Sequence, residues 1–575
     1  MQALIDFCPV HPGQAGALRC AFDQPLQTLV AHTPHAVRPL LATVERLARQ
    51  GRWCVGYVRF EAAPAFDAAL AVHAADGPLA WFGVYDKALD WPTDETHEPA
   101  VARWHDSLTR ADFDHHMDRI HQAIGAGELY QINYTAPLLG ELQGSPRALF
   151  QALHQAQPGG YAAFIDNGVE QLLSVSPELF FDWQGQHILT RPMKGTAPRG
   201  ADAEQDAQQV AQLRASPKEQ AENVMIVDLL RNDLSRIAEP HSVQVPQLFR
   251  IETLPTVFQM SSDVTATTKP GTTLADVFAA LFPCGSVTGA PKVQAMQLIR
   301  TLEPQARGIY CGAIGVVRPG GHATFNVAIR TVTVKDGAAR CGIGSGITFD
   351  ATAAGEWQEW RNKRAFLERA SQPFQLLETL RLEDGQLRDE PLHLARMARA
   401  AQHFGYPFPL AALKQALAQQ AQACPQGVRR VRLLLDARGA VAAERFALET
   451  TPVPVRLRLA ATPFEAAHSE FVRYKTTQRA HYEAAAPQES RVFDTLLWNA
   501  QGELTECTRA SIAVKLNGRW RTPPLACGLL DGVARARYLE EGRIEEGVIR
   551  LEDLPRAQGL AVFNSLRGWI EAELA

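Results

Sequence analysis

The stretch AARCGIGSGITFDATAAGEWQEWRNKRAFLERA (338–370) decides the fold of the first two-thirds of the chain. Its glycine-rich beginning, 338–348, predicts a strand and a turn, and 356–370 predicts a helix. Glu356 and Glu359 are three residues apart, so on a helix both carboxylates project from one face. The stretch therefore predicts two acidic side chains on a helix that directly follows a strand.

A second predicted helix repeats this arrangement. KEQAENVMIVDLLRNDLSRIA (218–238) carries Glu219 and Glu222 at the same spacing. Two such faces that meet would surround Mg²⁺ with oxygen ligands, because this ion binds few carboxylates and keeps water and substrate oxygens in its shell. Spacing alone leaves a second interpretation open, in which both pairs are solvated helix surface.

The bulk composition limits the classes of protein to consider. The chain has 575 residues, of which 46% are hydrophobic and 21% charged, as in an ordinary globular protein of two or three domains. A net charge of −5 without basic runs argues against a nucleic acid partner. The nine cysteines include no CxxC pair, and the start of the chain lacks a signal-peptide pattern. No apolar run is long enough to span a bilayer, so we expect a cytoplasmic protein with no membrane contact.

Changes in pattern divide the chain. Residues 1–105 read as a mixed N-terminal region, and 106–370 alternate strands with helices. SQP (371–373) breaks the pattern, because a proline disfavours helix in the residue before it. A new unit, 374–575, begins with two strand-like runs around Asp384-Gly385, a pair that favours a hairpin turn. The same patterns predict strands at 172–183 and 187–196.

Eight motifs in the first two-thirds narrow the class of protein. In their order they resemble the chorismate-utilising enzymes, which include anthranilate synthase, isochorismate and salicylate synthases and aminodeoxychorismate synthase component I. The resemblance implies an α/β (α+β) fold with a large antiparallel sheet sandwich and a cleft that binds chorismate. The motifs are GELYQINYT (127–135), SVSPELF (174–180), RPMKGTAPRG (191–200), AENVMIVDLLRNDLSR (221–236), GSVTGAPK (285–292), AIRT (328–331), GIGSGI (342–347) and EWQEWRNK (356–363).

Carried over by position, the resemblance assigns binding roles. Chorismate is a dianion, which suits a guanidinium grip on its carboxylates and close approach by glycine backbone. The implied substrate-binding residues are Arg330, Lys363, Tyr310, Gly344, Gly346 and Ser286, with Thr288 as an alternative to Ser286. The implied Mg²⁺ ligands are Glu222 and Glu359, with Glu219 and Glu356 close behind them.

Two residues indicate which chorismate reaction runs. Glu178 matches the family's general acid, and a carboxyl with a raised pKa could protonate the departing ring hydroxyl. Lys194 is similar to the lysine of aminodeoxychorismate synthases, whose amine is thought to add to ring carbon 2 before ammonia enters at carbon 4. Gln131 occupies the position of the lysine base in water-using relatives. Two alternatives remain: Lys194 only pairs with a substrate carboxylate, or the unit is an anthranilate synthase component I.

The last third of the chain carries a second set of motifs. They resemble the fold-type-IV pyridoxal-phosphate enzymes, which include aminodeoxychorismate lyase and the branched-chain and D-amino-acid aminotransferases. The resemblance implies that Lys475 forms the Schiff base with pyridoxal 5'-phosphate, Glu506 pairs with the pyridinium nitrogen, and Arg396 clamps the phosphate with backbone amides of 528–534. The motifs are LHLARMARAAQHFGY (392–406), YKTTQRAHYEAA (474–485), DTLLWNAQGELTECTRASIAV (494–514), TPPLACGLLDGVARAR (522–537) and FNSLRG (563–568).

Together the two units predict a bifunctional enzyme of 4-aminobenzoate (folate) biosynthesis. Chorismate and ammonia would give 4-amino-4-deoxychorismate, and the second unit would then eliminate pyruvate. Because the chain lacks a Gly-x-Cys-x-Gly motif, the resemblance implies a separate glutamine amidotransferase subunit or free ammonia. The second unit could instead be an amino-acid transaminase or a non-catalytic docking module for the amidotransferase. A homodimer through this unit is expected by analogy with other fold-type-IV enzymes.

Overall fold

Two compact units make up the chain, Met1–Pro373 and Phe374–Ala575. The computed structural model describes residues 2–10, 17–92, 100–199, 203–253, 257–489 and 491–575. Within these ranges, no helix combines the length and the apolar character needed to cross a bilayer.

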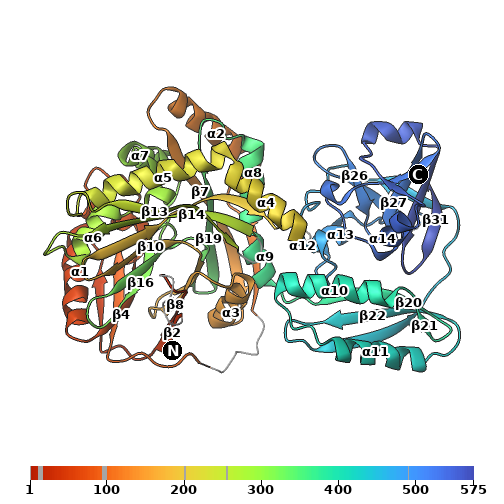
Figure 1. The fold of residues 1–575 in the computed structure, drawn as a ribbon, viewed down its shortest axis with the longest axis horizontal. Helices are drawn as coiled ribbons and strands as arrows, with labels where there is room; N and C mark the ends of the chain where they lie inside the picture. The colour runs from red at the N-terminus through yellow and green to blue at the C-terminus, as the bar shows by residue number, and fades with distance from the viewer. Residues whose placement is uncertain (1, 11–16, 93–99, 200–202, 254–256, 490) are drawn as a thin grey trace. The chain divides into compact units, whose positions relative to one another are not determined.

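The first unit is built on two sheets whose strands all pair antiparallel (Figure 1). The first sheet has the order β15 (Gly289–Ala290), β7 (Gln131–Gln143), β19 (Ala338–Ile347), β18 (Thr331–Lys335), β9 (Gln171–Ser176), β8 (Tyr161–Asp166), β1 (Ala3–Phe7) and β2 (Leu18–Phe22), and β6 (Val101–Asp106) pairs with β7. The second has the order β12 (Met193–Pro198), β14 (Val257–Thr267), β11 (His187–Arg191), β10 (Leu179–Gln184), β17 (Ala323–Val327), β16 (Ala313–Val317), β4 (Trp53–Val58), β5 (Ala80–Tyr85) and β3 (Gln27–Ala31), and β13 (Gln244–Thr253) pairs with β14.

Both sheets are buried on both faces. Successive residues of a strand point to opposite sides, and here each side packs against a hydrophobic core. Ile5 of β1 and Tyr57 of β4 belong to one core shared by the two sheets. Leu4 packs on the opposite side with α2 and α3, and Val58 packs with α1 and α6. The predicted sheet sandwich is therefore confirmed, with helices covering each outer face. The helices are α1 (Pro34–Arg49), α2 (Arg110–Gly125), α3 (Pro146–Ala156), α4 (Ala203–Ala215), α5 (Pro217–Ser235), α6 (Leu274–Leu281), α7 (Lys292–Leu302), α8 (Ala353–Lys363) and α9 (Ala365–Ser371), with 3-10 turns η1 (Phe60–Ala65) and η2 (Gly285–Val287).

The N-terminal region 1–105 is interleaved with the rest of this unit. Its strand β1 pairs with β8 in the first sheet, and its strand β4 pairs with β16 in the second. A boundary near residue 105 therefore does not separate two cores, because strands from both sides of it hydrogen-bond within the same sheets.

Several predicted elements differ from the observed ones in detail. The strand expected at 172–183 is two strands, β9 and β10, interrupted at Pro177-Glu178. The helix expected at 356–370 is also two helices, α8 and α9, which meet at Arg364. Conversely, the strand and turn expected at 338–348 form one unbroken strand, because β19 pairs with β7 along its whole length. In β19, pairing with the neighbouring strand thus overrides the local turn signal of the glycines.

The second unit contains two smaller sheets. The hairpin expected at Asp384-Gly385 is present, and both residues have positive φ, 48° and 78°. The first sheet has the order β21 (Gln386–Leu387), β20 (Leu376–Glu383), β22 (Val428–Leu435) and β23 (Val441–Ala447). The second has the order β26 (Leu504–Cys507), β25 (Asp494–Trp498), β24 (Val455–Leu459), β31 (Gly568–Leu574), β30 (Gly559–Asn564), β27 (Ser511–Leu516), β28 (Arg519–Thr522) and β29 (Glu545–Glu546). The helices are α10 (Glu390–Phe404), α11 (Leu410–Gln422), α12 (Glu470–Arg473), α13 (Ala480–Ala485) and α14 (Val533–Glu540).

Phe278 of α6 should be a sensitive position of the first unit. Its ring is fully buried and lies 5.2 Å from the ring of Phe325 and 5.4 Å from that of Phe181. We expect Phe278→Ala to lower the free energy of unfolding by about 3–5 kcal/mol, because it removes a large buried ring. Chemical denaturation of the full chain measures this. Val169→Ala, at an exposed valine, is the control, and an equally small loss in both variants would contradict the expectation.

Candidate active sites

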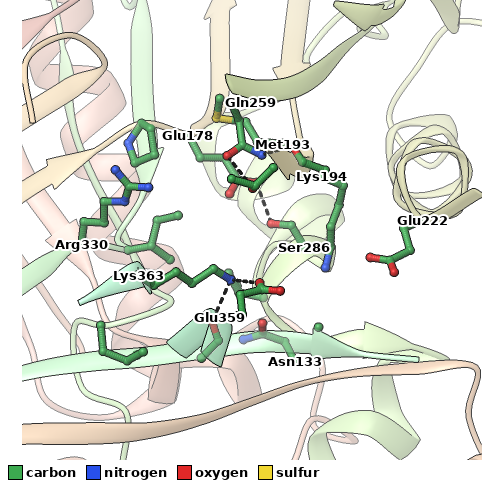
Figure 2. A pocket seen from close by; sticks show the side chains of 18 of the residues that line it. Asn133, Glu178, Met193, Lys194, Glu222, Gln259, Ser286, Arg330, Glu359 and Lys363 are labelled. Carbon is green, nitrogen blue, oxygen red and sulfur yellow. Dashed lines mark hydrogen bonds and ion pairs between the residues drawn. The ribbon is translucent and has the colours of Figure 1, made fainter. Parts of the chain in front are cut away.

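One pocket of the first unit collects the residues that the motifs singled out (Figure 2). It opens between the ends of β12 and β19, with α5 and α8 contributing acidic side chains. Apart from Thr288, the alternative to Ser286, every residue expected at the chorismate site lines it: Glu178, Lys194, Glu219, Glu222, Ser286, Tyr310, Arg330, Gly344, Gly346, Glu356, Glu359 and Lys363. Asn133, Lys218 and Gln259 also line the pocket and were missed as site residues.

Lys194 projects into this pocket from β12. Figure 2 shows its amine between the carboxylates of Glu222 and Glu359. The amine lies so close to the backbone of Gly346 that a Cβ atom at that position would overlap it. Asn223 holds the strand in place by donating a side-chain hydrogen bond to the Lys194 carbonyl, at 3.3 Å. The glycine at position 346 therefore lets the Lys194 amine take this position, which an added methyl group would force it to leave.

The glycines of β19 give room to protein groups along one face of the strand. Gly342, Gly344 and Gly346 alternate, so they share that face. A Cβ at Gly342 would overlap the ring of Tyr310, and one at Gly344 would overlap the side chain of Thr135. We expected Gly344 and Gly346 to allow close approach of the substrate. The absence of side chains at these positions also leaves room for neighbouring protein side chains.

Glu178 lies at the interruption between β9 and β10 and is 3% exposed. Its Oε1 accepts a hydrogen bond of 2.7 Å from the Ser286 hydroxyl. Burial raises the pKa of this carboxyl to about 7, although the Ser286 hydrogen bond and the charge of Lys194 act in the opposite direction. Near neutral pH the group can therefore both hold and release a proton, as a general acid requires.

The four glutamates share the pocket without closing into a ligand cluster. Burial and the neighbouring Glu222 raise the pKa of Glu219, and burial and Glu359 raise that of Glu356. Across the described residues, no three acidic, His or Cys side chains lie together as metal ligands. The predicted meeting of the two acidic faces is thus looser than expected. It still fits Mg²⁺, which takes one or two carboxylates with water and substrate oxygens. At Glu359 the neighbouring Lys363 outweighs burial and lowers the pKa, so this carboxylate is already charged.

Two cations also line the pocket, and one of them pairs with an acidic residue of its own helix. Lys363 Nζ lies 2.7 Å from Glu359 Oε1 and donates to the Gly344 carbonyl at 3.0 Å. Burial lowers the pKa of Arg330 to about 10, so it remains charged at neutral pH. Figure 2 shows both side chains entering on the side opposite Glu222.

Two glutamines complete the surroundings of Lys194. The side-chain amide of Gln259 donates to the Gly195 carbonyl at 2.9 Å. Gln131 is 1% exposed, and neither side-chain atom has a hydrogen-bond partner among the residues that the structure describes. Its alternation with Asn133 along β7 is the sequence signal that could have identified Asn133 as a pocket residue.

The second unit surrounds one buried amine with charged groups. Burial lowers the pKa of Lys475 to about 7, and Arg396 adds to this effect while Glu506 opposes it. Glu506 is 4% exposed and accepts hydrogen bonds from the Tyr482 hydroxyl at 2.6 Å and the Leu530 amide at 3.2 Å. Burial raises the pKa of Glu506 to about 7. The three residues expected at the cofactor site are therefore electrostatically coupled.

Arg396 is bound more tightly by protein than the sequence indicated. Its Nε and Nη2 donate to the carboxylate of Glu378 at 2.8 and 2.6 Å, and its Nη1 donates to the Asp531 carbonyl at 3.0 Å. A guanidinium has five N–H donors, so two remain for a phosphate. Glu378 was missed, although a glutamate within the apolar strand LLETLRL (376–382) is a recognisable signal.

The residues of this site fit pyridoxal phosphate. Lys475 supplies an amine, Glu506 a carboxyl for a ring nitrogen, and Arg396 spare donors. Gly532 immediately precedes α14. A Cβ at this position would lie only 3.0 Å from the Ser511 hydroxyl, so a side chain here would crowd the turn. Helix-start amides of this kind bind phosphate groups.

Comparison with known proteins agrees with both halves of this description. A family model for chorismate binding enzymes matches residues 16–369, and one for class IV aminotransferases matches 375–573. The chain belongs to the chorismate-binding enzymes and carries a class IV aminotransferase domain.

Individual relatives point to the same family. Aminodeoxychorismate synthase component 1 of Klebsiella aerogenes is 42% identical over 46% of this chain, and anthranilate synthase component 1 of Streptomyces coelicolor is 37% identical over 52%. The chain spans 58% of the length of each of these relatives. The crystal structure of anthranilate synthase component I from Streptococcus pneumoniae has a TM-score of 0.54 at 23% identity, covering 64% of this chain and 92% of that one, which shows a shared fold.

Glu178 should make the stability of the first unit depend on pH. Its pKa is raised from 4.5 to about 7, so between these values the folded chain binds more protons than the unfolded chain, and stability falls as pH rises. Glu178→Gln removes this loss. We expect its stability relative to wild type to rise by on the order of 1–3 kcal/mol between about pH 4.5 and pH 8.

Chemical denaturation across this pH range measures the effect. Glu141→Gln, at an exposed glutamate of β7, is the matched control. An equal pH-dependent change in both variants would rule out Glu178 as its source.

Proposed function

We propose that the chain makes 4-aminobenzoate from chorismate and ammonia in two steps, one in each unit. The proposal rests on the Lys194 amine, which lies against Gly346 in a pocket lined by carboxylates and by the buried carboxyl of Glu178. Membership of the chorismate-binding enzymes supports chorismate as the substrate. Similarity to aminodeoxychorismate synthase component 1 supports an amino group as the one introduced.

In the first step the Lys194 amine attacks carbon 2 of the chorismate ring. The hydroxyl on carbon 4 takes the proton of Glu178 and leaves as water. Ammonia then attacks carbon 4, Lys194 leaves carbon 2 as a free amine, and the surplus proton of the ammonia returns to Glu178. The net change exchanges one hydroxyl for one amino group and leaves both residues as they began.

Charge complementarity would hold the substrate for this step. Arg330 and Lys363 would bind its carboxylates. Glu222 and Glu359, with Glu219 and Glu356 behind them, would hold Mg²⁺, which neutralises negative charge beside the substrate when bound. Ammonia would come from a separate glutamine amidotransferase subunit, since the related synthases are named as component 1 of their enzymes.

In the second step, 4-amino-4-deoxychorismate would lose pyruvate in the second unit. Pyridoxal phosphate, when bound, supplies an electron sink for the carbon that carries the amino group. Lys475 takes a proton from ring carbon 4 and gives one to the methylene carbon of the departing enolpyruvyl group, which leaves as pyruvate. A pKa of about 7 suits both transfers. Arg396 would bind the phosphate, and Glu506 would pair with the ring nitrogen.

The product of the purified full chain with chorismate, ammonium, Mg²⁺ and pyridoxal phosphate tests the proposal directly. We expect 4-aminobenzoate and pyruvate, identified by mass. Lys475→Ala should stop the reaction at 4-amino-4-deoxychorismate, and Lys194→Ala should abolish its formation. Anthranilate as the product would make the first unit an anthranilate synthase. Steady glutamate formation from D- or branched-chain amino acids with 2-oxoglutarate would make the second unit a transaminase, and full lyase activity in Lys475→Ala would remove its assigned role.

Gly346→Ala should show whether the position of the Lys194 amine affects turnover without affecting the stability of the fold. The new methyl group would overlap the Lys194 amine and lie 2.8 Å from Gln131 Nε2. Because the lysine is flexible, we expect an unchanged unfolding midpoint but a loss of chorismate turnover of about 100-fold, as for a small displacement of a reacting group. Gly125→Ala, at a helix end with no atom near the added methyl, should retain full turnover. Wild-type turnover in Gly346→Ala would contradict the seating argument.

A further inference from the structure

Arg330 is an unusual, partly buried cation. It lines the pocket, and its backbone has a φ of 48°, in the left-handed region that non-glycine residues rarely adopt. Burial is the cause of its lowered pKa, and in the described part of the chain no carboxylate lies within ion-pair distance of its guanidinium. Backbone strain of this kind persists only where the surroundings enforce it, typically at functional sites.

Three buried arginines of the chain, by contrast, have carboxylate partners. Arg307 pairs with Glu303 at 2.6 Å, Arg191 with Asp263 at 2.6 Å, and Arg396 with Glu378 at 2.6 Å. This is the usual arrangement, because a buried charge is costly unless it is paired. Arg330 is therefore left with its charge uncompensated while it faces the pocket.

Gln157 is the residue that holds Arg330. It follows the last turn of α3, is 1% exposed, and its side-chain Oε1 accepts a hydrogen bond from Arg330 Nη1. The reversed amide orientation would direct an NH₂ group at the guanidinium, so donor chemistry fixes the oxygen toward Arg330. The ring of Phe366 lies 5.9 Å from the guanidinium carbon and adds an uncharged wall.

We propose that Gln157 is a positioning residue that orients Arg330 without neutralising it, and so reserves its positive charge for a carboxylate of the substrate. The inference rests on the proposed function for the identity of the substrate, chorismate. A glutamate at this position has nearly the same shape and would make the same contact. It would also form a buried ion pair with Arg330 and remove the charge that the substrate carboxylate needs.

The test is the affinity of the full chain for chorismate, measured by calorimetry with Mg²⁺ and without ammonia. We expect Gln157→Glu to weaken binding by at least about tenfold, as for the loss of a charge-assisted hydrogen bond. In steady-state turnover the same variant should raise KM while leaving kcat within about twofold. Gln157→Asn, which keeps a neutral amide, should bind more tightly than Gln157→Glu.

A double-mutant cycle separates this role from a structural one. If Gln157 acts through Arg330, then Arg330→Gln and the combination Arg330→Gln with Gln157→Glu should bind chorismate equally weakly. Gln50→Glu is the matched control, because the Gln50 oxygen also accepts from an arginine, Arg46, but at an exposed helix end. It should bind as wild type does.

Two results would overturn the inference: wild-type affinity in Gln157→Glu, or a loss from Gln157→Glu that persists in the Arg330→Gln background. Failure of the proposed function is a different result. In that case the wild-type chain would give a product other than 4-aminobenzoate, while the pattern of chorismate affinities among the variants would stand.

Discussion

The contact between the Lys194 amine and the bare backbone of Gly346 is the constraint around which the first pocket is arranged. It brings together a glycine of β19, which pairs with β7, and a lysine of β12, which belongs to the other sheet. The acidic side chains of α5 and α8 then surround the amine. The position of the amine therefore depends on the absence of a side chain at position 346, and a single added methyl group would displace it.

The buried ion pair between Arg307 and Glu303 stabilises the wall of this pocket through hydrogen bonds. Glu303 Oε1 accepts from the Thr135 amide and hydroxyl, both at 3.0 Å. Arg307 donates to the carbonyls of Asn133 and Val287, both at 2.7 Å. Burying two charges is unfavourable unless their remaining hydrogen bonds are satisfied, and here they are used to join β7, η2 and the loop that carries Tyr310. The pocket wall is thus held by polar groups inside the fold rather than by apolar packing alone.

The two units use burial in the same way. Burial raises the pKa of Glu178 and of Glu506 to about 7, and it lowers that of Lys475 to about 7. Carboxyls and amines thereby approach a common range in which each can exchange a proton near neutral pH. The two arginines differ in their partners. Gln157 is neutral and leaves the charge of Arg330 uncompensated, whereas the carboxylate of Glu378 neutralises Arg396.

The sequence by itself determined the helix around Glu219 and Glu222, because the spacing of its residues reports which of them share a face. The order of its motifs, through the family resemblance that they carry, determined the sheet sandwich and most of the charged side chains that line the first pocket. Only the tertiary structure decided which distant groups meet. The interruption at Glu178, the seating of Lys194 on Gly346, and the pairings of Gln157 with Arg330 and of Glu378 with Arg396 all join separate elements. Local patterns carry no information about such contacts, since each depends on how sheets and helices pack in three dimensions.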